Sequence, residues 1–274
     1  MLSSLSIWTV SLLIQTATAW EPRIVNGEMV RWSQAQIGFE INTDNAPNLS
    51  EEEVETAVVA AAKEWDGSIH DANTQLHYDG LSKKSGADLS DGTHIVSFDT
   101  TWNQDPSLLA VTHVWSDANH DIVHFDIEIN ADGVLWATTG DPNKHDLHNT
   151  MTHEFGHALG LEHSDDIAAR MASTTSMGEL SKRDVHNDDI QGFVSLYPMQ
   201  DGSNTEQNDP AEPTEDNQGS GSNGGVDNAL IPAAGGSGGS GGPVSLEKAG
   251  CTTQPYNIAF WMLGIIGLLP FRRR

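Results

Sequence analysis

Residues 153–163 read HEFGHALGLEH, and the spacing of the residues in this segment is the strongest indication of the fold class. Residues 147–159 carry apolar side chains at helical spacing, which predicts a helix here. His153 and His157 are four apart, so on a helix both imidazoles point the same way and can share one metal ion. Glu154 lies beside His153, where its carboxylate can accept a proton from a metal-bound water. The stretch therefore predicts a catalytic metal site with Glu154 as the general base.

Gly160 supplies the turn that a third ligand needs. A helix that continued past this residue would carry His163 away from the metal. Glycine adopts left-handed backbone angles without steric cost and can end a helix sharply, so we expect the chain to double back and His163 to become the third ligand. Taken singly, each histidine would more often be a core or surface residue, but the joint spacing makes accident a poor explanation. Three histidines leave the fourth position of a zinc ion for water, as in a catalytic site.

The string H-E-x-x-H-x-x-G-x-x-H is the metzincin signature, and the chain resembles the matrixin branch of these zinc proteases. Met171 follows the motif at the spacing of the matrixin methionine turn, and Ser164 follows the third histidine as it does in matrixins. Residues 180–198 are similar to the closing helix of matrixin catalytic domains. Residues 30–41 look like the first strand of bacterial matrixin-like proteases. The resemblance covers about residues 24–198.

The resemblance implies an α+β metzincin catalytic domain with a mixed, twisted sheet of about five strands and three helices. Ser50 and Glu53 form a candidate capping box at the start of the first helix. The segment from Ala110 to Trp115 would be the edge strand above the zinc, where an extended peptide can pair with it. The expected elements are a helix over 50–65, strands over 37–41, 75–78, 94–98, 110–115 and 122–129, the motif helix, and a final helix from about residue 188.

The function implied by the resemblance is zinc-dependent endopeptidase activity on peptide bonds of extracellular proteins. The open alternative is a zinc-bearing cell-surface binding or adhesion module without hydrolysis. Glu154 argues against that alternative, because a non-catalytic site has no need of a base. No cysteine precedes the zinc motif, so the propeptide cysteine that keeps matrixins latent is missing there. Either the enzyme is made active or something else inhibits it.

A second group of histidines and acids occupies residues 113–128, and in matrixins the equivalent region carries structural zinc and calcium. The alternating pattern is also that of solvent-facing residues on a strand and turn, which makes a second zinc the less expected outcome. A calcium ion stays an open alternative, since several oxygen donors could converge. The members are His113, Asp117, His120, Asp121, His124, Asp126 and Glu128.

The charge balance limits the partners of the protein. Asp and Glu number 39 against 13 Lys and Arg, a formal charge of -26. A surface this acidic repels phosphate backbones, so we expect no nucleic-acid partner. The expected partners are protein or peptide substrates, and we expect a monomer. The single cysteine, Cys251, allows no intramolecular disulfide.

The N-terminal residues 1–19 read as a secretory signal peptide. An apolar run over 5–14 is followed by the small-residue cleavage pattern Ala-Thr-Ala at 17–19. A buried first strand is the alternative reading. Export would leave residues 20–200 as an extracellular or cell-surface catalytic domain.

The C-terminal part divides into a linker and a tail. Residues 201–250 are acidic and Gly/Ser-rich with few large apolar side chains, which predicts a disordered linker. Within residues 251–274, an apolar run over 258–271 precedes three arginines and predicts a short hydrophobic helix in contact with the membrane. With Cys251, the tail resembles bacterial sorting tags of the MYXO-CTERM kind, which implies membrane retention followed by processing at or near that cysteine. An ordinary membrane anchor is the equal alternative.

Overall fold

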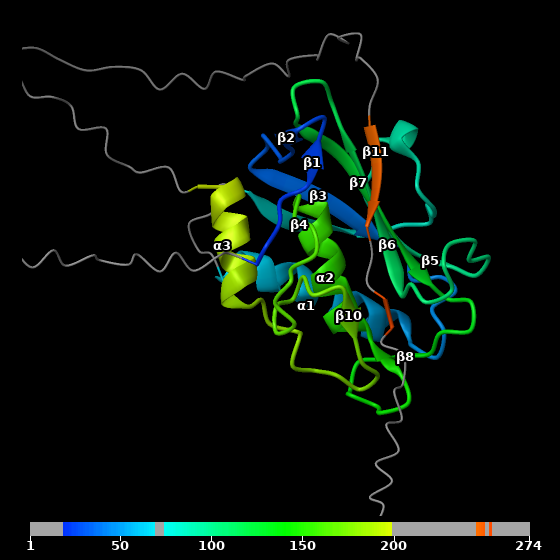
Figure 1. Cartoon of the computed structure of the whole chain (residues 1–274). Helices are drawn as coiled ribbons and strands as arrows, with labels where there is room; N and C mark the ends of the chain where they lie inside the picture. The colour runs from blue at the N-terminus through cyan, green and yellow to red at the C-terminus, as the bar shows by residue number, and fades with distance from the viewer. Residues whose placement is uncertain (1–18, 69–73, 199–244, 250–251, 254–274) are drawn as a thin grey trace, which may run out of the picture.

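The computed structural model describes residues 19–68, 74–198, 245–249 and 252–253 (Figure 1). Apart from Ala19, the predicted signal peptide lies outside these residues, and so does the apolar run 258–271. Among the residues described, no helix combines the length and apolarity that crossing a membrane requires.

The centre of the molecule is a six-stranded mixed sheet in the order β11-β6-β7-β5-β3-β4. Strand β6 is antiparallel to both of its neighbours, while β7, β5, β3 and β4 pair in parallel. Five strands come from the predicted catalytic domain, which confirms the mixed sheet expected from the sequence. The bounds are β3 Gln36–Ile41, β4 Gln75–Leu81, β5 Ile95–Asp99, β6 Ala110–Ser116, β7 Ile122–Asn130 and β11 Ser245–Ala249.

Strand β11 differs from the expectation, because residues 245–249 fall in the stretch predicted to be a disordered linker. Short pairs complete the strand inventory of the described residues. They are β1 Ile24–Val25 with β2 Glu28–Met29, β8 Trp136–Ala137 with β9 His145–Asp146, and β10 Thr174–Thr175 with β12 Thr252–Thr253.

Three α-helices accompany the sheet, as predicted. They are α1 Glu51–Ser68, α2 Leu147–Ala158 and α3 Asn187–Leu196, with a 3-10 turn η1 at Leu89–Asp91. The predicted capping box starts α1. The Glu53 carboxylate accepts the N–H of Ser50 at 2.8 Å, and the Ser50 hydroxyl accepts the N–H of Glu53 at 3.3 Å. These bonds satisfy amides that the first helical turn leaves without partners.

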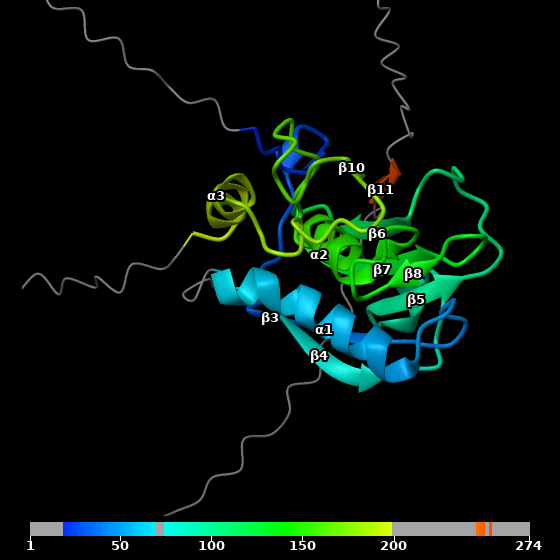
Figure 2. The same cartoon turned by 90° about the horizontal axis from the view of Figure 1, so that it is seen from below.

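Helices α1 and α2 pack against each other and cover one face of the sheet (Figure 2). The indole of Trp65 in α1 donates a hydrogen bond to the carbonyl of Thr152 in α2 at 2.9 Å. The rings of Phe39 in β3 and Phe155 in α2 lie 5.0 Å apart between their centroids. Packing of large, fully buried side chains on both sides of α2 fixes the helix that carries the zinc motif.

Candidate catalytic metal site

His153 and His157 project from α2 in a defined orientation. Nδ1 of His153 donates to the carbonyl of Arg170 at 2.9 Å, and Nδ1 of His157 donates to the carbonyl of Leu161 at 2.8 Å. A proton on Nδ1 leaves Nε2 with its lone pair available as a ligand. Within the described residues, Nε2 of each ring is buried and has no hydrogen-bond partner. Such buried acceptors are costly unless something binds them, and a metal ion fits that need.

The chain reverses direction at Gly160 and returns His163 to the other two imidazoles. Gly160 has a φ of +91°, the left-handed conformation that the sequence predicted. A Cβ added there would lie 2.8 Å from the carbonyl oxygen of Val30, so a side chain is excluded as well. The candidate ligand atoms of the three histidines all lie within 4.8 Å of one another. This spacing allows one ion to contact all three nitrogens.

The surroundings of the imidazoles favour their neutral, metal-binding form. Burial, and to a lesser extent the neighbouring His163, lowers the pKa of His153 to about 3. Burial and the two other histidines hold the pKa of His157 well below its ordinary value. Neutral imidazole is the form that coordinates a metal, so the residues present suit a zinc ion.

Glu154 is fully buried beside the histidines, and Thr112 of β6 contacts it. The Thr112 hydroxyl lies 2.6 Å from Oε2 of Glu154, a distance typical of a hydrogen bond to a carboxylate. Sequence reasoning missed Thr112. The available signal was a polar residue at the core-facing position between Ala110 and Val114, which are both buried in the hydrophobic core.

Met171 lies below the site and is 1% exposed. A Cβ at Gly156 would collide with the sulfur of Met171, so this glycine lets the methionine approach α2. The Asp189 carboxylate of α3 holds the turn, since it accepts the N–H of Arg170 at 2.7 Å and that of Met171 at 2.9 Å. It also accepts the N–H of His186 at 2.8 Å, which caps α3. Arg170 carries the carbonyl that orients His153, so Asp189 acts on the site through this turn.

Two further bonds join the closing helix region to distant parts of the chain. The hydroxyl of Ser164 donates to Oδ2 of Asp188 at 2.7 Å. The hydroxyl of Tyr197 accepts the N–H of Trp32 at 3.1 Å and donates to the carbonyl of Leu159 at 2.8 Å. The last turn of α2 is therefore tied to both ends of the catalytic domain.

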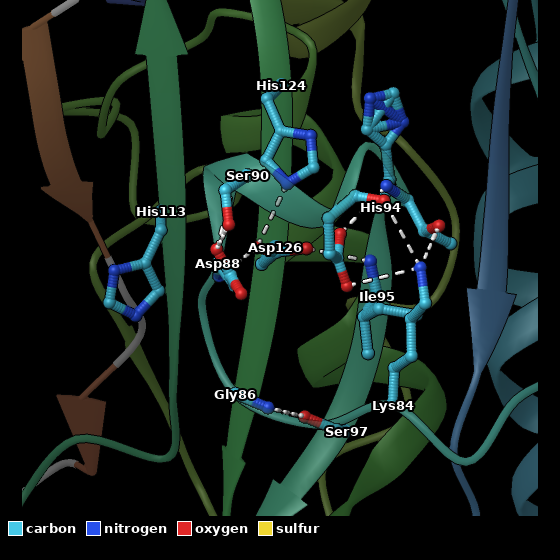
Figure 3. Close-up of polar contacts among 12 residues, drawn as sticks. Lys84, Gly86, Asp88, Ser90, His94, Ile95, Ser97, His113, His124 and Asp126 are labelled. Atoms are coloured by element: carbon cyan, nitrogen blue, oxygen red, sulfur yellow. Dashed lines mark hydrogen bonds and ion pairs between the residues drawn. The ribbon is translucent and has the colours of Figure 1, made fainter.

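The predicted second cluster separates into pairs rather than one site. Figure 3 shows His124 beside Asp126, with His113 apart from them. Nε2 of His113 lies 2.6 Å from Glu128, and Nε2 of His124 lies 3.1 Å from Asp126. Asp126 also accepts the N–H of Asp88 at 2.9 Å. In the part of the chain that the structure describes, the three motif histidines form the one group of three or more side-chain donors close enough to hold an ion. A structural zinc in this cluster therefore has no geometric support.

The arrangement is that of a metzincin-type zinc metallopeptidase site. It combines a helix with two histidines, a glycine turn to a third, a buried carboxylate and a methionine beneath them. The sequence model of the matrixin family matches residues 31–198, well over half of the chain, and the chain belongs to that family. Its catalytic domain is thus of the zinc metalloendopeptidase class.

The known proteins similar to the chain include three enzymes of animals. It is 45% identical over 62 residues to matrix metalloproteinase-16 of Homo sapiens, a stretch covering 22% of this chain and 10% of that protein. It is 26% identical over 191 residues to neutrophil collagenase of Homo sapiens, covering 67% and 35%. The hatching enzyme of Paracentrotus lividus is 29% identical over 162 residues, covering 58% and 25%. The chain therefore spans about a third or less of the length of these relatives.

Proposed function

We propose that this protein is a zinc-dependent endopeptidase that hydrolyses peptide bonds of extracellular proteins. His153, His157 and His163 would hold the zinc ion, and Glu154 would be the general base. The observation that carries the proposal is the convergence of three ligand atoms within 4.8 Å, from residues adjoining a buried carboxylate. Bound zinc would supply Lewis acidity, which polarises a carbonyl group and makes a water molecule more acidic.

The residues of the chain have separate tasks in this reaction. Glu154 takes a proton from the attacking water and passes it to the leaving amine. Thr112 directs Oε2 of Glu154 and so fixes where that proton is received. Strand β6 offers backbone groups to an extended substrate, which aligns the scissile bond with the site. Arg170 and Leu161 orient the two helical imidazoles through their carbonyls.

The competing function is a zinc-bearing binding or adhesion module. A carboxylate with no catalytic task would be costly to bury completely, and here it is buried beside the histidines and hydrogen-bonded to a threonine. This arrangement favours hydrolysis. Export through a signal peptide at residues 1–19, retention through residues 251–274 and a monomeric state belong to the same proposal. A calcium ion stays a prediction, for which metal analysis of the purified protein is the measurement.

The test uses unfolded casein as substrate and compares the parent chain with Glu154→Ala. We expect kcat/KM to fall by about 10²- to 10⁴-fold, the usual contribution of a general base. The variant should retain its zinc, because Glu154 is not proposed as a ligand. A matched His163→Ala variant should lose both zinc and activity. Casein cleavage by Glu154→Ala at the rate of the parent would refute the assigned mechanism.

A further inference from the structure

Strand β11 occupies the edge that a peptide substrate would need. Its residues Ser245–Ala249 pair antiparallel with β6, from Ser245 opposite Ser116 to Ala249 opposite Thr112. In Figure 1, β11 is the orange strand that runs along β6. Without β11, β6 would end the sheet and present unpaired backbone groups. A segment from near the C-terminus therefore takes up the backbone hydrogen bonds of this edge.

The same segment also pairs with the chain that follows the methionine turn. Thr252–Thr253 form β12, which is parallel to Thr174–Thr175 in β10. Strand β10 begins three residues after Met171, in the chain that leaves the turn below the histidines. Two residues of sequence separate β11 from β12. The segment thus contacts both β6 and the chain that follows the methionine turn.

The register of β11 places its last residue opposite Thr112, which contacts the proposed general base. Ala249, the last residue of β11, is opposite Thr112. The hydroxyl of Thr112 lies 2.6 Å from Oε2 of Glu154. The last residue of β11 therefore pairs with the residue whose hydroxyl lies against the proposed general base.

Protection of a sheet edge against aggregation is the simpler explanation of β11, since proteins often cover such edges. That role would require pairing with β6 alone. It gives no reason for the second pairing with β10, nor for a register that ends beside Thr112. An extended segment held between two backbone partners across a hydrolytic site is instead how a peptide substrate would be bound.

We propose that residues 245–249 and 252–253 lie in the substrate cleft of their own chain and exclude other peptides from it. The inference rests on the proposed function, because it takes the groove beside β6 as the substrate cleft. A tethered segment acts at an effective concentration of about millimolar when its linker can span the distance, so weak backbone pairing is sufficient for occupancy. The segment inhibits the enzyme by competition until it is displaced or removed.

The experiment uses the full chain in a Glu154→Ala background, so that no segment is cut during the measurements. Glu247→Pro/Lys248→Pro removes two adjacent N–H groups of β11, while the matched Glu247→Gln/Lys248→Gln keeps the backbone intact. Amide hydrogen exchange of β6 is measured by mass spectrometry. In the proline variant, about half of the β6 amides, those that face β11, should exchange at least about tenfold faster. The glutamine variant should match the parent, and α2 should stay protected in all three proteins.

Binding of fluorescein-labelled casein to the same three proteins tests the exclusion of other peptides. The proline variant should bind at least about fivefold more tightly than the parent, because its cleft is no longer occupied by a tethered competitor. Equal exchange of β6 in all three proteins would overturn the proposal. Faster exchange with unchanged casein binding would also overturn it, since β11 would then only cover an edge. If both results hold but the proline variant with Glu154 intact fails to cut casein, the proposed function is wrong while the occupancy of the cleft stands.

Discussion

Among the single residues of the site, Thr112 orients the carboxylate of Glu154. Its side chain is fully buried, and its hydroxyl lies within hydrogen-bond distance of both Oε2 of Glu154 and, at 3.2 Å, the carbonyl oxygen of the same residue. A carboxylate fixed in this way needs no reorientation when it receives a proton, which is the advantage of a preorganised site. If Glu154 is the general base that we propose, Thr112 is a positioning residue for it.

Thr112→Val tests this role with nearly the same side-chain volume. A hydrogen bond to a charged group contributes about 1.5–3 kcal/mol, so kcat should fall by about 10- to 100-fold. KM should change little, because strand β6 keeps its backbone. Thr112→Ser restores the hydroxyl and should recover most of the lost kcat in casein-peptide assays. Equal losses in the valine and serine variants would show that packing, not the hydroxyl, is responsible.

The sequence was sufficient to predict the local geometry that brings the three histidines of the proposed site together. His153, His157 and the turn at Gly160 follow from helical spacing and from the conformational freedom of glycine. Thr112 and Asp189 were not predicted as partners of the site. Their contacts with Glu154 and Met171 bridge 42 and 18 residues of chain, and short-range spacing contains no information about such pairs.

Among the contacts between elements, a half-buried carboxylate joins the end of α1 to the start of β4. Oδ1 of Asp66 accepts the N–H of Leu76 at 3.2 Å. Burial raises the pKa of Asp66 to about 6, and the hydrogen bond from Leu76 offsets only part of this effect. The carboxylate therefore ionises less readily in the folded protein than in the unfolded chain.

Asp66→Asn keeps a carbonyl oxygen for Leu76 and removes this ionisation. Because the pKa of Asp66 is higher in the folded state, the folded parent binds more protons than the unfolded chain. Ionisation of Asp66 therefore lowers the free energy of unfolding of the parent as pH rises from about 4 to about 6. The gain in stability of Asp66→Asn over the parent should therefore increase across that range and level off above it. Urea unfolding at a series of pH values measures the difference, with the exposed Glu28→Gln as the control for loss of one charge. A difference that is constant with pH would contradict this linkage.

Element prediction succeeded where periodicity was strong and failed where it was absent. The alternating residues of β7 and the capped start of α1 predicted both elements to within a few residues. Residues 245–249 follow a Gly/Ser-rich stretch and contain one large apolar side chain, which predicts a linker. They form a strand because β6 provides an unpaired edge, a partner more than a hundred residues away.

For the whole molecule, we expect metal binding at the histidine site to raise the free energy of unfolding. Two imidazole nitrogens of α2 are buried without hydrogen-bond partners among the described residues. A ligand that binds the folded state alone stabilises it by mass action, and the site joins α2 to the chain beyond Gly160. Bound zinc should therefore stabilise the packing of the chain beyond Gly160 against α2.

Metal removal by a chelator should lower the free energy of unfolding by about 4 kcal/mol when zinc had been present at a thousand times its Kd. Calorimetry with and without chelator measures the effect as a shift in Tm. Glu154→Ala should show the same shift, since it keeps the three ligands. His163→Ala should show little or none. A large chelator shift in His163→Ala would place the stabilising metal elsewhere.

The bond between Tyr197 and Trp32 links residues that are 165 positions apart. The ribosome synthesises Trp32 long before Tyr197. The bond that Tyr197 makes to the end of α2 can therefore form only after nearly the whole catalytic domain has been synthesised. Translation of the residues after Pro198 carries Tyr197 clear of the ribosomal exit tunnel. In a chain halted before Tyr197, the carbonyl of Leu159 at the end of α2 would lack its hydrogen bond from Tyr197. We therefore expect proteolytic activity only after synthesis of the domain is complete.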